Sequence, residues 1–154
     1  CISYDKKHLF GMADEPKNYS AGEQHCLIEY LGWKIKPIVC YDLRFPTWCR
    51  NTTDYDVLLV VANWPSKRIT HWDALIKARA IENQCYVVGV NRVGTDGNNI
   101  YHSGNSLVID PLGQVLYHMP DDEDVNTVTI SKDYLNEVRE KFPFWKDGDG
   151  FSLV

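Results

Sequence analysis

The apolar runs of the chain are short, and their residue types predict buried strands. "DVLLVVANW" (56–64) and "CYVVGVNRVG" (85–94) are rich in valine and nearly continuous, which is typical of strands covered on both faces. Between them, residues 70–84 contain good helix formers, and Thr70 is a residue type that can cap a helix start. This order of strand, helix and strand predicts an α/β layered fold.

Shorter patterned segments flank this unit. Residues 27–30 and 34–39 predict two strands that turn at Gly32, and residues 106–118 predict a hairpin. Residues 125–131 alternate between apolar and polar positions and predict a half-buried strand. Because hairpins and a strand–helix–strand unit occur together, the predicted sheet is mixed.

The remaining pattern adds one helix and one loop. Residues 132–142 predict an amphipathic helix, whereas residues 11–22 are polar and turn-rich and predict a loop. No repeat or linker interrupts the sequence, so residues 1–154 are interpreted as one domain.

Composition narrows the class of protein. The 154 residues are 44% hydrophobic and 24% charged, with a formal net charge of −5 and no block of lysine and arginine. These values argue against nucleic acid or an anionic membrane as a partner. No apolar run approaches the roughly 20 residues that span a bilayer. The chain contains five scattered cysteines: Cys1, Cys26, Cys40, Cys49 and Cys85. Their odd number and irregular spacing argue against a disulfide framework or a zinc site, and favour a protein of the reducing cytoplasm. No metal is expected.

Cys40 lies in "IVCYDLRFP", directly after the predicted strand 34–39 and before a segment that can turn into a short helix. The start of a helical turn lowers a thiol pKa, and the Tyr41 N–H is placed to hold an oxyanion. Free cysteine is also among the most buried residue types. On its own context, Cys40 therefore fits a buried core residue better than a nucleophile.

Two other segments change this balance. "YDKKHLF" places Lys6 and His8 in a K-x-H-L frame, and "ANWP" places Trp64 at the end of a predicted strand, where α/β sheets bind ligands. With "VCYDLRFPTW", they resemble the nitrilase (carbon–nitrogen hydrolase) superfamily. "ARAIENQCYVVGVNRVG" and "SGNSLVIDPLG" are similar to that family as well, so the resemblance covers almost the whole chain. "YDKKHLFGMADE" is most similar to the bacterial omega-amidase branch.

The resemblance implies a fold, an activity and an assembly. The fold is an α-β-β-α sandwich with mixed sheets, and members pair into homodimers or higher oligomers. The omega-amidase branch hydrolyses small-molecule monoamides of dicarboxylates such as 2-oxoglutaramate, without a cofactor. The chain resembles the C-terminal portion of such an enzyme, lacking the N-terminal segment.

The resemblance also implies site residues. Cys40 would be the nucleophile that forms a thioester, and Lys6 with the Tyr41 N–H would stabilise the oxyanion. Glu15 matches an auxiliary glutamate, although a solvated loop acid explains it equally well. The resemblance places the general-base glutamate of the family upstream of Cys1; Glu23 and Glu29 are weaker substitutes.

Further side chains have weaker assignments. We expect Trp64, Asn63 and Arg92 to contact substrate, with an arginine holding an anionic substrate tail. Asp42 and Arg44 are expected to form an ion pair that braces the Cys40 turn. Lys7 is interpreted as the solvent-facing neighbour of Lys6, and Arg79 and Glu82 as a helix-stabilising pair.

Three alternatives remain open from the sequence. The first is another nitrilase branch, such as an aliphatic amidase, a carbamoylase or a true nitrilase. The second is a papain-like protease in which His71 or His102 partners Cys40, which would leave Lys6 unexplained. The third is a catalytically silent interaction fragment.

Overall fold

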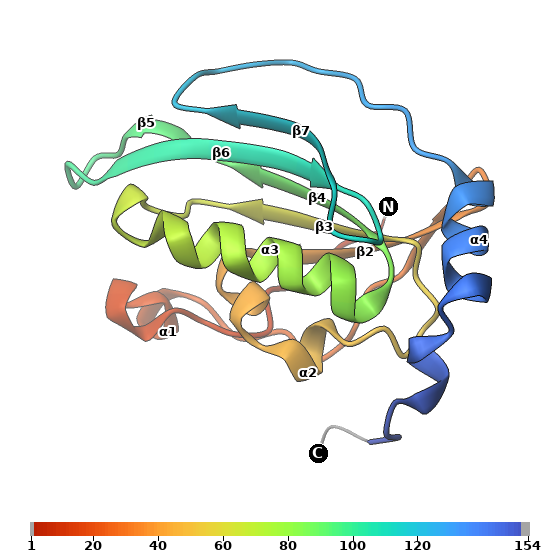
Figure 1. Ribbon diagram of the computed structural model, residues 1–154. Coiled ribbons are helices and arrows are strands. Elements are labelled where there is room, and N and C mark those ends of the chain that lie inside the picture. Colours follow the sequence, from red (N-terminus) through yellow and green to blue (C-terminus); the bar gives the residue numbers. More distant parts are fainter. Residues whose placement is uncertain (1, 152–154) are drawn as a thin grey trace.

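A seven-stranded mixed sheet forms the centre of the protein in the computed structural model, which describes residues 2–151 (Figure 1). Three neighbouring strands are parallel: β2 (Trp33–Val39), β3 (Val57–Ala62) and β4 (Tyr86–Asn91). The others pair antiparallel at the two sides: β1 (Ile28–Tyr30) with β2, and β6 (Tyr101–Ile109) with β4, β5 (Val93–Thr95) and β7 (Val115–Pro120).

The helices differ greatly in length. α3 (Ile69–Asn83) is the longest and lies over one face of the sheet, whereas α4 (Lys132–Lys141) lies at one end (Figure 1). Single-turn α1 (Glu15–Asn18), α2 (Pro46–Cys49) and 3₁₀ turns complete the list: Gly11–Ala13, Cys40–Arg44, Ser66–Arg68 and Phe144–Asp147. No helix among residues 2–151 combines the length and apolar character needed to cross a membrane.

The two long helices begin differently. The predicted cap at Thr70 is wrong, because the 3₁₀ turn Ser66–Arg68 runs directly into α3 and no side chain caps it. The predicted helix 132–142 is confirmed, and the Ser131 hydroxyl accepts a hydrogen bond from the Tyr134 N–H at 3.1 Å. This cap satisfies one of the backbone donors that a helix start leaves free.

The main core lies between α3 and the sheet. Leu58 and Val60 of β3 are fully buried in one cluster with Trp72 and Ile76 of α3. Gly89 of β4 permits this close approach, since a Cβ there would lie 2.9 Å from the Trp72 ring. Helix and sheet therefore pack as two layers without a gap for a side chain.

The opposite face of the sheet is covered at one end only. Val57 and Tyr86, at the starts of β3 and β4, form a second cluster with Leu135 of α4. Towards the strand ends, Val61 is 45% and Val90 is 49% exposed. The prediction that both strands are covered on both faces is therefore wrong for the described chain, because α4 reaches only their first residues.

The strand predicted at residues 125–131 is also wrong. This segment is irregular and connects β7 to α4 as a long loop (Figure 1), and Val125 is 98% exposed. Alternating apolar and polar residues can give a segment one apolar face, but a strand also needs a hydrogen-bonded neighbouring strand. None lies beside this segment among the described residues. The predicted hairpin 106–118 is confirmed by β6 and β7, whereas the β5–β6 hairpin was not predicted.

The predicted mixed α/β class is confirmed. Residues 2–151 contain one mixed sheet with one long helix over it, which corresponds to one α layer and one β layer of the predicted sandwich.

Candidate active site

Cys40 occupies a sharp turn where β2 ends. Val39 is the last residue of β2, and Cys40 opens the 3₁₀ turn that leads into α2, as predicted. The φ angle of Cys40 is 47°, in the left-handed region that side-chain-bearing residues rarely adopt. Such strain costs roughly 1–3 kcal/mol and persists where the surroundings over-determine it, often at functional sites.

A fully buried carboxylate, Asp42, holds this turn. It accepts hydrogen bonds from the Tyr4 hydroxyl at 2.8 Å, the His8 N–H at 2.8 Å and the Val39 N–H at 3.1 Å. The His8 Nδ1 lies 2.8 Å from the same carboxylate. Asp42 thereby joins the N-terminal segment that carries Lys6 to the turn that carries Cys40.

The expected ion pair between Asp42 and Arg44 is wrong. Asp42 points into the protein, where donors from the N-terminal segment satisfy it. The Arg44 guanidinium lies 4.7 Å from the Trp64 ring centroid and 3.1 Å from the His71 Nδ1. The pair expected between Arg79 and Glu82 is present at 2.9 Å.

Lys6 and Glu15 form a close ion pair beside the turn. The Lys6 Nζ lies 2.8 Å and 2.5 Å from the two Glu15 carboxylate oxygens, and Glu15 also accepts from the Phe10 N–H at 2.7 Å. Lys7 instead lies with its Nζ 5.5 Å from the Trp48 ring centroid. Glu15 is thus an engaged carboxylate, and Lys6 and Lys7 have separate surroundings.

These side chains surround one cavity of about 760 Å³. Lys6, Glu15, Cys40 and Asn63 all line it. Trp64 lines a small adjoining cavity of about 40 Å³ together with Cys40 and Tyr41. The structure therefore brings together side chains from the N-terminal segment and from the ends of β2 and β3, where parallel strands present ligand sites.

Arg92 lines neither cavity. Its side chain is exposed, with Nη2 3.5 Å from the Thr95 carbonyl oxygen. Arg68, which the sequence interpretation did not select, lines the larger cavity instead, together with His102, which it named only for the protease alternative. The sequence could have indicated Arg68, because this residue follows the end of β3 by a few positions and so belongs to the same edge of the sheet.

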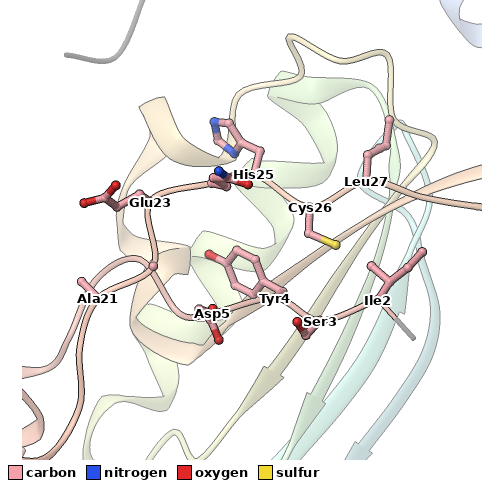
Figure 2. Close-up of a pocket in the computed structure, with 11 residues that line it drawn as sticks. Ile2, Ser3, Tyr4, Asp5, Ala21, Glu23, His25, Cys26 and Leu27 are labelled. Atoms are coloured by element: carbon pink, nitrogen blue, oxygen red, sulfur yellow. The ribbon is translucent and has the colours of Figure 1, made fainter.

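A second cavity, of about 540 Å³, lies between residues 2–5 and 21–27 (Figure 2). His25 and Cys26 line it, and Glu23 projects outward, away from the other side chains drawn (Figure 2). Neither Glu23 nor the exposed Glu29 lines the Cys40 cavity. In the described part of the chain, no group of three or more histidine, cysteine or acidic side chains is arranged to hold a metal.

Neither histidine of the protease alternative is paired with Cys40 among residues 2–151, although His102 lines the same cavity. His71 contacts Arg44, and the buried Nδ1 of His102 has no hydrogen-bond partner among residues 2–151. No hydrogen bond joins either ring to the Cys40 thiol in that range. A papain-like arrangement places the histidine within hydrogen-bond reach of the thiol, and it would leave the Lys6–Glu15 pair beside Cys40 unexplained.

The protonation of Cys40 is governed mainly by burial. Desolvation raises the pKa of the Cys40 thiol above its ordinary value, against lowering effects of the Lys6 charge and a hydrogen bond from the Asn63 backbone. Glu15 and Asp42 raise the pKa further. The expected net lowering of this pKa is therefore wrong, since a single 3₁₀ turn does not outweigh desolvation.

Alkylation of Cys40 by iodoacetamide should follow a pH profile whose midpoint lies above that of free cysteine. Lys6→Ala removes a cation and should move the midpoint up, whereas Glu15→Gln removes an anion and should move it down. Peptide mapping by mass spectrometry measures each site, with buried Cys49, whose thiol pKa is raised to about 11, as the internal control. A Cys40 midpoint below that of free cysteine would contradict the role of burial.

Replacing Asp42 should weaken both the fold and the site. Asp42→Asn puts an amide donor against the Tyr4, His8 and Val39 donors, and breaking such a buried network costs about 3 kcal/mol. Urea unfolding measures the loss, with exposed Asp14→Asn, in the left-handed region that asparagine tolerates, as a control expected to change by less than about 1 kcal/mol. Equal stability of the two variants would show that Asp42 does not hold the turn.

With this geometry established, comparisons with known proteins identify the family. The carbon-nitrogen hydrolase family matches residues 2–140, and the chain belongs to that family. The chain is 52% identical over 155 aligned residues to the omega-amidase YafV of Escherichia coli K12, covering 97% of this chain and 59% of the relative. It is 41% identical to the 2-oxoglutaramate amidase of Bacillus subtilis, covering 94% of this chain and 56% of that enzyme.

Solved structures confirm the nitrilase-superfamily fold. XC1258 of Xanthomonas campestris, a CN-hydrolase superfamily protein with an arsenic adduct in its active site, superposes with a TM-score of 0.96 at 49% identity, covering 98% of this chain and 60% of that one. A mutant of the amidase from Nesterenkonia sp. AN1, in which acrylamide has added to the active-site cysteine, gives a TM-score of 0.78 at 28% identity, with 94% of this chain and 57% of that one covered. The chain thus spans about three fifths of the length of these relatives.

Proposed function

We propose that this chain carries the cysteine and the lysine of an amide hydrolase, and that its substrates are monoamides of dicarboxylates. The observation that carries the proposal is the shared cavity in which Cys40, on its strained turn, lies with the Lys6–Glu15 pair. The similarity to an omega-amidase and to a 2-oxoglutaramate amidase supports the substrate class.

The proposed chemistry proceeds through a thioester. The Cys40 sulfur bonds to the amide carbonyl carbon, and the carbonyl electron pair moves to the oxygen, which Lys6 and the Tyr41 N–H stabilise. The carbon–nitrogen bond then breaks, and the proton released by the thiol leaves with ammonia. Water attacks the thioester, releases the carboxylic acid and restores the thiol.

A carboxylate must carry the proton between these steps. Glu15 is the glutamate that the described residues place in the cavity, but Lys6 and the Phe10 N–H already engage it. We assign Glu15 the auxiliary role of positioning Lys6 and tuning the thiol. The role of general base falls to a group outside the described residues.

Ammonia release tests the function directly. The complete protein should hydrolyse glutaramate, the monoamide of glutarate, and leave the matching nitrile and N-carbamoyl acid unreacted. Preferred release from either of those compounds would assign the chain to another branch of the family. No release from any compound would contradict the proposed function.

A further inference from the structure

Arg68 is a cation without an anionic partner inside the active-site cavity. The charge of Lys6, the other basic side chain of that cavity besides His102, is opposed by Glu15 at 2.5 Å. No carboxylate oxygen of residues 2–151 lies within 4.0 Å of the Arg68 guanidinium. The guanidinium also donates no hydrogen bond to any of these residues. Its donors are therefore available to a ligand.

Contacts hold Arg68 at its backbone and at its guanidinium. Its carbonyl oxygen accepts a hydrogen bond from the Trp64 indole at 2.8 Å, which fixes the backbone. Its guanidinium lies 5.5 Å from the Phe10 ring centroid, within the range of a cation–π contact. Phe10 and Arg68 line both the main cavity and the small cavity beside Cys40. A planar guanidinium held in this way loses little freedom when it binds a carboxylate through two parallel hydrogen bonds.

Two acidic side chains that line the cavity with Arg68 are bound to other groups of the protein. Glu15 is paired with Lys6, and the Asp96 carboxylate accepts hydrogen bonds from the backbone of Asn98 at 2.8 Å and of Ile100 at 3.0 Å. His102 also lines the cavity, but it is 3% exposed and its Nδ1 is buried below the cavity surface. The Arg68 guanidinium is therefore the group of this cavity that remains to bind an anion.

We infer that Arg68 binds the carboxylate of the substrate and selects monoamides with a free acid end over neutral amides. This assignment rests on the proposed function, because it places the amide of the same molecule at Cys40. Arg68 takes the role that the sequence interpretation gave to Arg92, whose exposed side chain lies outside both cavities.

Ligand binding without chemistry tests the assignment first. In a Cys40→Ala background of the complete protein, isothermal titration should show that Arg68→Met weakens glutarate binding about 100-fold, the loss expected for charge-assisted hydrogen bonds. Lys67→Met removes an exposed cation from the preceding position and should change the affinity by less than about twofold. Unchanged affinity in Arg68→Met, or an equal loss in Lys67→Met or Arg92→Met, would overturn the inference.

Steady-state kinetics then separate this inference from the proposed function. With Cys40 present, Arg68→Met should raise the KM for glutaramate about 100-fold and leave kcat/KM for the neutral amide pentanamide within about threefold. An equal loss on both amides would show that Arg68 is structural instead of selective. If the unaltered protein hydrolysed neither amide, the proposed function would fail, whereas the glutarate titration would still decide the role of Arg68.

Discussion

Cys40→Ala should lower kcat/KM for glutaramate by about 10⁴-fold or more, because removal of a nucleophile leaves only the binding and oxyanion groups to act. Alanine keeps the Cβ at the strained φ of 47°, so the turn held by Asp42 should persist and the melting temperature should change little. Ammonia release and circular dichroism measure the two effects separately.

Cys26→Ala is the matched control for this prediction. Cys26 is another free, partly buried thiol, but it lines the second cavity (Figure 2). Its replacement should leave kcat/KM within about twofold, as expected for a side chain that touches no reacting group. Retained activity in Cys40→Ala, or its loss in Cys26→Ala, would show that the nucleophile has been assigned to the wrong thiol.

Lys6→Ala should lower kcat by about 10³-fold, which corresponds to roughly 4 kcal/mol of transition-state stabilisation. Lys6 lines the cavity with Cys40, and loss of its ammonium would also leave the Glu15 carboxylate without its cation. Lys7→Ala removes the same charge from the next residue, where the ammonium lies over Trp48, and most activity should remain.

The comparison of these two variants separates a catalytic cation from general electrostatics. Lys6→Arg should recover part of the loss, since charge is kept while the donor geometry changes. If Lys7→Ala lost the activity and Lys6→Ala kept it, the assignment of Lys6 to the oxyanion would be wrong.

Local patterns were sufficient to predict the elements that position Cys40. Apolar runs predicted β2, β3 and β4, and helix-forming residues predicted α3, because these segments bury their own side chains against one another. Residues 125–131 misled the same reasoning, since alternation in the sequence says nothing about whether a neighbouring strand exists.

The side-chain contacts of the site were harder to predict, because they depend on distant parts of the chain. Asp42 and Arg44 are close in sequence, but Tyr4 and His8 satisfy Asp42 from more than thirty positions away. Arg92 was a reasonable choice at the end of β4. However, Asn91 turns inward to bond Trp64 and Gly104, and neighbouring strand residues point to opposite sides, which leaves Arg92 outside.

The most direct test of the account is intact-mass and peptide-mass spectrometry of the complete protein during turnover of a slowly hydrolysed amide. The account predicts a mass increase equal to the substrate minus ammonia on the peptide that contains Cys40, and its absence from the Cys40→Ala variant. An adduct on any other residue, the same adduct on Cys40→Ala, or turnover without an adduct when quenched at steady state would contradict a thioester at Cys40.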